Sequence, residues 1–194
     1  MPDTSKETAP KTIRLADYRP PNWLVDEVHL TFKLHPKHTI VQSRIAFRPN
    51  PAATDHTFEL DGEDLSLRWA RVNGQDCKPQ IEGNVLRTNV PDAPFIWEAE
   101  VEINPAANTV LEGLYMSNDL YCTQCEAEGF RRITYYPDRP DVMAPFTVRI
   151  ETGEPFKLPN GNLAPGDAPL PVLLSNGNPV ASGPGWAEWH DPWP

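Results

Sequence analysis

The sequence has no long run of apolar residues, and this lack limits where the protein acts. No stretch approaches the roughly 20 consecutive apolar residues that a membrane-spanning helix needs. The first ten residues, MPDTSKETAP, also lack the apolar centre of a secretory signal peptide. We therefore expect a cytoplasmic protein without a membrane partner.

Cysteine and positive charge are scarce as well. The three cysteines, Cys77, Cys122 and Cys125, are too few and too unevenly spaced for a secreted disulfide framework, and a reducing compartment fits them. The chain carries 17 Lys plus Arg against 27 Asp plus Glu, a net charge of -10. This charge repels phosphate backbones and anionic lipid surfaces, so we expect no nucleic-acid partner.

Proline, in contrast, is abundant, with 23 residues spread along the chain. Each proline lacks an N–H donor and clashes with the preceding helical turn, which excludes long helices. The length of 194 residues is nevertheless sufficient for one large β domain with a real core. Strands and loops should therefore dominate the fold.

Alternation of apolar and polar residues gives the strongest strand predictions. Residues 27–34 (EVHLTFKL) alternate clearly, and 41–47 continue the pattern after a turn at 35–38, which predicts an antiparallel hairpin. Residues 95–103 form the cleanest long strand, with an acidic outer face. Further strands are predicted at 57–60, 65–72, 85–90, 146–150 and around Trp186 and Trp189, with a tight hairpin turn at Asn176-Gly177.

The absence of a βαβ rhythm favours an all-β fold, an antiparallel two-sheet β-sandwich of saddle-like shape with long loops and little helix. Residues 1–12 are predicted to be a mobile arm and 13–194 a single β domain. The stretch from Glu154 to Pro171, with five prolines and two glycines, predicts a surface loop. The predicted buried set comprises Val28, Leu30, Phe32, Trp97, Val101, Ile103, Phe146 and Val148.

The segment Cys122-Thr123-Gln124-Cys125 allows three interpretations. A Cys-x-x-Cys pair can be half of a structural zinc site, but two more ligands would be needed and Cys77 and the histidines offer no fitting spacing. A redox pair is expected between a strand and a helix in a βαβ setting, which this sequence does not offer. The remaining interpretation is a pair of buried or half-buried thiols.

A second cluster follows at Gln124, Glu126 and Glu128. In an extended segment, residues two apart point to one side, so these three side chains would face the same space. Two carboxylates and an amide in a cleft suit a bound ammonium or guanidinium group. Alternatively, Glu126 and Glu128 pair internally with Arg131 or Arg132, or lie in solvent.

The string from Leu111 to Val142, LEGLYMSNDLYCTQCEAEGFRRITYYPDRPDV, closely resembles the amino-terminal domain of the bacterial aminopeptidase N family. The likeness covers the chain from about residue 12 onward. The further segments that resemble this family in order are YRPP at 18–21, LDGEDL at 60–65, INPAANT at 103–109, LLSNGN at 173–178 and WHDP at 189–192.

The resemblance implies a zinc-dependent exopeptidase that removes amino-terminal residues from peptide substrates. It implies that Glu126 helps to bind the substrate α-ammonium, that Gln124 contacts the substrate beside it, and that Glu128 has no equally clear role. No histidine here is followed by glutamate and, at the fourth position, a second histidine, so zinc and catalytic residues are expected in a separate catalytic domain of the same polypeptide. A free-standing β-sandwich module that binds a cationic or peptide ligand, or a structural spacer, are the alternatives.

Overall fold

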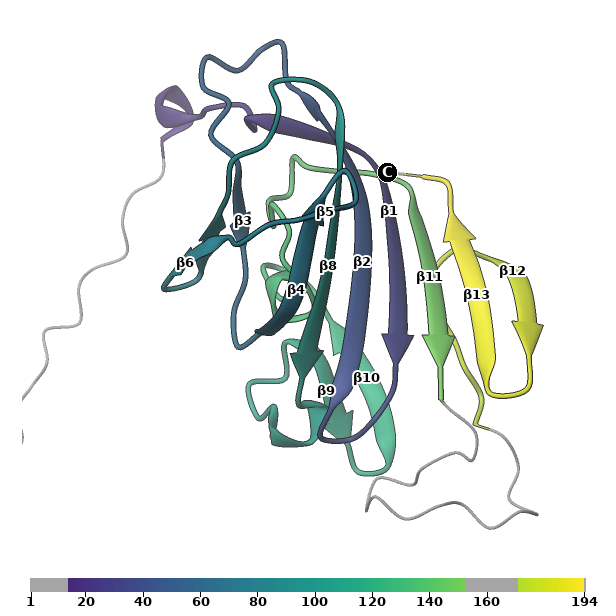
Figure 1. Cartoon of the computed structure of the whole chain (residues 1–194). Coiled ribbons are helices and arrows are strands. Elements are labelled where there is room, and N and C mark those ends of the chain that lie inside the picture. The colour runs from purple at the N-terminus through teal and green to yellow at the C-terminus, as the bar shows by residue number, and fades with distance from the viewer. Residues whose placement is uncertain (1–13, 153–170, 194) are drawn as a thin grey trace, which may run out of the picture.

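The computed structural model describes residues 14–152 and 171–193, which are organised around one large curved sheet (Figure 1). This eight-stranded sheet has the order β12-β13-β11-β1-β2-β8-β4-β5. Its strands are β1 (Trp23–Lys33), β2 (Thr39–Pro49), β4 (Ser66–Val72), β5 (Gln75–Asp76), β8 (Phe95–Ile103), β11 (Phe146–Glu151), β12 (Asn178–Gly183) and β13 (Trp186–Asp191). The all-β prediction is confirmed.

Two smaller sheets and three short 3-10 helices complete the described chain. One sheet has the order β3-β7-β6 and the other pairs β9 with β10. No helix within the described ranges is long and apolar enough to cross a membrane. The bounds are β3 (Glu59–Asp61), β6 (Gln80–Glu82), β7 (Val85–Arg87), β9 (Gly113–Ser117), β10 (Leu120–Gln124), η1 (Leu15–Asp17), η2 (Pro105–Ala107) and η3 (Phe130–Arg132).

The alternating sequences form the centre of the large sheet because one face of each strand is buried. β1 and β2 make the predicted antiparallel hairpin, and β8 pairs with β2 so that Val41 lies opposite Val101 and Ile45 opposite Trp97. All four of these side chains are fully buried. Burial of one such side chain stabilises the fold by about 1.5–3 kcal/mol, so this row alone strongly favours the observed register.

The second layer consists of the two small sheets and the irregular segment that follows β10. Its buried side chains join those of the large sheet in one core: Leu60 from β3, Leu86 from β7, Leu114 from β9, and Ile133 and Tyr135 from the segment after η3. The two packed layers of the predicted sandwich are therefore present. The second layer is assembled from short pieces rather than from one continuous sheet.

The strand β11 differs from the predicted pattern in two ways. It runs parallel to β1, with Val28 opposite Phe146, whereas every other pair among the described strands is antiparallel. Phe146 and Val148, predicted to be buried, are only half-buried. They line an open hollow, where Phe146 also contacts Phe130 and Tyr136 of the second layer.

The predicted hairpin turn at Asn176-Gly177 is wrong. The turn between β12 and β13 lies at 184–185, and Gly177 (φ +84°) precedes β12. There it passes so close to β13 that an added Cβ would lie 2.6 Å from the backbone N of Asp191. β12 is an edge strand whose pairing shifts register between Pro179 and Ala181. The predicted arm 1–12 and all but the end of the predicted loop 154–171 lie outside the described residues.

Candidate substrate-recognition site

The β9–β10 hairpin and the turn after it carry the residues singled out in the sequence. Gln124 is the last residue of β10 and pairs with Gly113, the first residue of β9. The chain then leaves the strand and turns, with the backbone N–H of Gly129 donating to the carbonyl oxygen of Cys125 at 2.8 Å. Gln124 therefore ends a strand, whereas Glu126 lies within a turn.

Gln124 and Glu126 lie on the same side of this turn. Both side chains are exposed, and both line the same hollow. Gln124 Nε2 donates a hydrogen bond to the carbonyl oxygen of Glu126 at 3.1 Å, which ties the amide to the turn. No Lys, Arg or His of the described residues forms an ion pair with the Glu126 carboxylate. A negative charge is thus available at the rim of the hollow.

The hollow has a volume of about 660 Å³ and an apolar floor. Side chains from β1 and β11 form this floor, and β10 with its turn forms a more polar rim. The apolar lining comprises Leu30, Phe32, Leu34, Leu114, Phe130, Ile133, Phe146, Val148, Ile150 and Leu174, and the polar lining includes Thr123, Gln124, Glu126, Ser175, Asn176 and Asp191. A carboxylate and an amide beside such a surface can accept hydrogen bonds from a cationic group.

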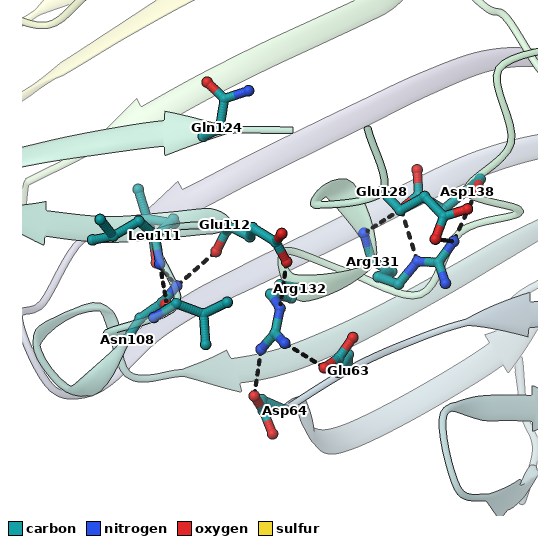
Figure 2. A network of polar contacts seen from close by, with 12 residues as sticks. Glu63, Asp64, Asn108, Leu111, Glu112, Gln124, Glu128, Arg131, Arg132 and Asp138 are labelled. Carbon is teal, nitrogen blue, oxygen red and sulfur yellow. Dashed lines mark hydrogen bonds and ion pairs between the residues drawn. The ribbon is translucent and has the colours of Figure 1, made fainter. Parts of the chain in front are cut away.

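Glu128 does not join the other two side chains. Its carboxylate lies 3.5 Å from Nη2 of Arg131, and it lines a second hollow of about 310 Å³ together with Asp61 and Asp138. Figure 2 shows Gln124 and Glu128 well apart, with Glu128 beside Arg131. The prediction that all three side chains face one space is wrong for Glu128, because the segment is not extended beyond Gln124. The alternative pairing of Glu128 with Arg131 is confirmed.

The sequence offered Arg131 as a partner of Glu126 or Glu128, but it did not predict the main partner of Arg131, which is Asp138. The Arg131 Nε donates to Oδ2 of Asp138 at 3.0 Å, its Nη2 donates to the Asp138 carbonyl at 3.1 Å, and its own backbone N–H donates to Oδ2 at 3.1 Å. The Arg131 side chain is 18% exposed and that of Asp138 is 11% exposed. The signal in the sequence was an arginine seven residues before an aspartate, which is too common a pattern to single out.

The cysteines near the site are free thiols. Burial, with a smaller effect from the charge of Asp138, raises the pKa of Cys125 to about 11, and burial raises the pKa of Tyr121 to about 12. Both groups are therefore protonated at neutral pH and line the hollow without charge. Within residues 14–152 and 171–193, no three His, Cys, Asp or Glu side chains gather in an arrangement that could hold a metal ion.

A peptidase family model and aminopeptidase sequence relatives match this chain. A family model described as the peptidase M1 N-terminal domain matches residues 26–167. The aminopeptidase N of Caulobacter vibrioides is 42% identical over 193 residues, which cover 95% of this chain and 21% of that protein. The aminopeptidase N of Escherichia coli is 42% identical over 185 residues, covering 92% and 20%. The chain thus spans about a fifth of the length of these relatives.

Solved structures agree with the sequence relatives. The aminopeptidase A of Legionella pneumophila, solved in complex with aspartic acid, superposes with a TM-score of 0.75 at 28% identity and covers 92% of this chain and 21% of its own. An M1 zinc metallopeptidase from Deinococcus radiodurans superposes with a TM-score of 0.64 at 15% identity and covers 88% of this chain and 39% of its own. The Deinococcus radiodurans protein thus shares the fold of this chain at low sequence identity.

Proposed function

This chain belongs to the peptidase M1 N-terminal domain family, and from that premise we propose that it is the amino-terminal domain of a zinc-dependent aminopeptidase. The parent enzyme would remove amino-terminal residues from peptides. The 42% identity to two proteins called aminopeptidase N supports this proposal. Because the chain spans about a fifth of their length, the catalytic domain would lie elsewhere in the same polypeptide.

The chain's own residues do not fit a catalytic zinc site. The sequence contains no His-Glu-x-x-His motif, and the described residues offer no group of three metal ligands. We therefore assign zinc to the remainder of the polypeptide and derive no chemical step from it. The contribution of this domain would be to bind and orient the substrate.

Glu126 and Gln124 would recognise the substrate's free α-ammonium. The observation that carries this role is the Glu126 carboxylate, which lies at the rim of the large hollow without an ion-pair partner among the described residues. An ammonium group presents N–H donors and a positive charge, and both complement a carboxylate beside an amide. A blocked amino terminus carries no charge, so it would leave the carboxylate unpaired and bind poorly.

The large hollow would be capped by the catalytic domain of the same polypeptide. Half-buried Phe146 and Val148 and exposed Leu174 give this surface an apolar character next to Gln124 and Glu126. Coverage by a second domain would remove this apolar surface from water and would also exclude water from the recognition site. Peptide substrates would then meet Glu126 in a cleft between the two domains.

We also propose a cytoplasmic location. The three free thiols, Cys77, Cys122 and Cys125, support a reducing compartment. Detection of the protein in the membrane or secreted fraction of its source cells, rather than in the soluble extract, would contradict this proposal.

Substitution of Glu126 by glutamine in the longer polypeptide tests the recognition role. A charge-assisted contact contributes about 1.5–3 kcal/mol, and since 1.36 kcal/mol is tenfold in rate, Glu126→Gln should lower kcat/KM by about 10- to 150-fold. Gln124→Ala removes a neutral contact of about 0.5–1.5 kcal/mol and should cost about 2- to 12-fold. Glu128→Gln is the matched control and should change kcat/KM least, because Glu128 lines the other hollow.

The measurement is kcat/KM on one aminoacyl amide, with zinc content and circular dichroism as controls for folding. Zinc content should be the same in all variants. Full activity of a well-folded Glu126→Gln enzyme would refute the recognition role and leave this domain as a spacer.

A further inference from the structure

The base of the β9–β10 hairpin sets the position of both candidate recognition residues. Gln124 ends β10 opposite Gly113, and the turn that carries Glu126 follows directly. The hydrogen bond from Gln124 Nε2 to the Glu126 carbonyl oxygen couples the two residues at 3.1 Å. A contact that fixes the hairpin base therefore fixes the recognition site.

The hairpin base packs against η3 without spare room. Gly113 has a φ of +70°, and a Cβ added there would lie 2.7 Å from Cβ of Arg132. A Cβ added to Gly129 would lie 2.5 Å from the carbonyl oxygen of Gln124 and 3.1 Å from the backbone N of Gly113. Because Gly113 lies against Cβ of Arg132, and Gly129 lies against the backbone of both Gly113 and Gln124, a shift of Arg132 would be passed on to Gln124.

The Arg132 side chain ties this contact to a third part of the chain. Its guanidinium pairs with Glu63 and with Asp64, both in the corner between β3 and β4, and its Nε lies 3.4 Å from Oε2 of Glu112, the residue before β9 (Figure 2). The Arg132 side chain is only 10% exposed. In the same corner, the backbone N–H of Glu63 donates to the Arg131 carbonyl oxygen at 2.9 Å. Three carboxylates from two segments thus converge on one nearly buried cation.

Glu112 is itself held in place by Asn108. The Asn108 Nδ2 group donates to the carbonyl oxygens of Glu112 at 2.7 Å and Leu114 at 3.0 Å, while its Oδ1 accepts from the backbone N–H of Val110 at 3.2 Å. The backbone that enters β9 is therefore rigidly supported. The Arg132 Nε atom makes no hydrogen bond within the described part of the chain, so its contact with Glu112 is an ion pair alone, and this pair connects the supported backbone to η3.

We propose that Arg132 is a positioning residue of the recognition site, which holds the hairpin base and through it Gln124 and Glu126. This inference rests on the proposed function above. Arg132 lines neither the large hollow nor the second one, so it would act without touching substrate. A planar guanidinium presents several donors in a fixed fork, whereas a lysine ammonium is a single point charge. Arg132→Lys therefore keeps the charge but loses the simultaneous hold on three carboxylates.

A double-mutant cycle in the longer polypeptide tests this role. Arg132→Lys should lower kcat/KM on an aminoacyl amide about tenfold. A misplacement of catalytic or binding groups by about 1 Å can cost about 100-fold, and we expect Gln124 and Glu126 to move by less than that. In a Gln124→Ala/Glu126→Gln background, the same substitution should change kcat/KM by less than about twofold, because no recognition group remains to be positioned. Arg71→Lys is the control: it alters an ion pair with Asp76 at the far edge of the large sheet and should change neither background.

The outcomes separate the two proposals. An equal loss from Arg132→Lys in both backgrounds would overturn the positioning role and make Arg132 a purely structural residue. Full activity of the Gln124→Ala/Glu126→Gln enzyme would refute the proposed function, and the positioning role would fall with it.

A second variant covers the case in which Arg132→Lys does not fold by circular dichroism. Glu112→Gln removes only the charge on the hairpin side and leaves the pairs with Glu63 and Asp64. We expect about a two- to fivefold loss of kcat/KM that disappears in the Gln124→Ala/Glu126→Gln background. A loss of the same size in that background would overturn the positioning role.

Discussion

Gly129→Ala should destabilise the protein and displace Gln124, because the structure has no space for one more methyl group at this position. The added Cβ would lie 2.5 Å from the Gln124 carbonyl oxygen and 3.2 Å from Cα of Cys125. Ordinary contacts begin at 3.4 Å, so the backbone would have to open by 3.4 − 2.5 = 0.9 Å. Since Gly129 has a φ of −85°, which alanine adopts freely, the cost is purely steric.

The expected magnitude follows from this overlap. Overpacking of a well-packed site costs about 1–3 kcal/mol. For a chain of this size, 1 kcal/mol lowers Tm by about 2–4 °C, so Gly129→Ala should lower Tm by about 2–12 °C. In the longer polypeptide, the displaced Gln124 should also lower kcat/KM, by no more than the about 2- to 12-fold expected for loss of its neutral contact.

Thermal and urea unfolding of the 194-residue chain, followed by tryptophan fluorescence, measure the stability change. Gly83 supplies the contrast, because it has a φ of +58° and an added Cβ there meets nothing within 4 Å. Gly83→Ala should cost about 1–2 kcal/mol through backbone strain alone, and Gly83→Asn less, since asparagine tolerates this conformation. Gly129→Asn should be no better than Gly129→Ala. An unchanged Tm together with full activity for Gly129→Ala would refute the steric argument.

Three further predictions concern the 194-residue chain itself. It should hydrolyse no aminoacyl substrate and retain no stoichiometric zinc after dialysis, whereas one tightly bound zinc per chain would revive a site at Cys122 and Cys125. Ser43→Ala should lower the free energy of unfolding in urea by about 1–3 kcal/mol, because the buried Thr134 hydroxyl loses its acceptor at 3.1 Å. Adding Thr134→Val should recover part of that loss. Strictly additive costs of the two substitutions would contradict the argument. Burial raises the pKa of Cys125 from 9.0 to about 11, so between these pH values the thiol loses its proton only in the unfolded chain. The stability that the buried thiol contributes is therefore complete below pH 9 and is lost as the pH rises to 11. Over this interval the wild-type chain should lose more free energy of unfolding than Cys125→Ala.

The central strands could be predicted from the sequence because burial of one face imposes a simple alternation. The pattern in 95–103 has its counterpart in β8, where every second side chain from Phe95 to Ile103 is buried. The outer layer gave weaker signals. β9 and β10 form a two-stranded sheet with few buried side chains, so their residues carry no regular pattern of this kind. The parallel run of β11 beside β1 is set by contacts between distant segments, which a local pattern does not encode.

The site could be predicted only as far as the strand continued. Gln124 and Glu126 share a hollow, as predicted, although Glu126 already lies in the turn and not in an extended strand; the same turn directs Glu128 to Arg131. The role of Arg132 depends on carboxylates 69, 68 and 20 positions away in sequence, at Glu63, Asp64 and Glu112. Such an arrangement arises from the packing of η3 between two other segments. The spacing of residues along one sequence does not predict such contacts between distant segments.

The parallel pairing of β1 and β11 also has a consequence for synthesis of the chain. Val28 lies opposite Phe146, so 146 − 28 = 118 residues separate the two partners. Val28 pairs with Ile45 of β2 first, and Phe146 follows Ile45 by 146 − 45 = 101 residues. At a translation rate of about 5–20 residues per second, β1 must therefore wait about 5–20 s longer for its other neighbour. During this interval one edge of β1 is open, and unpaired edges invite association with other strands. On the ribosome, the first long strand of this domain therefore stays open to such association until β11 has been made.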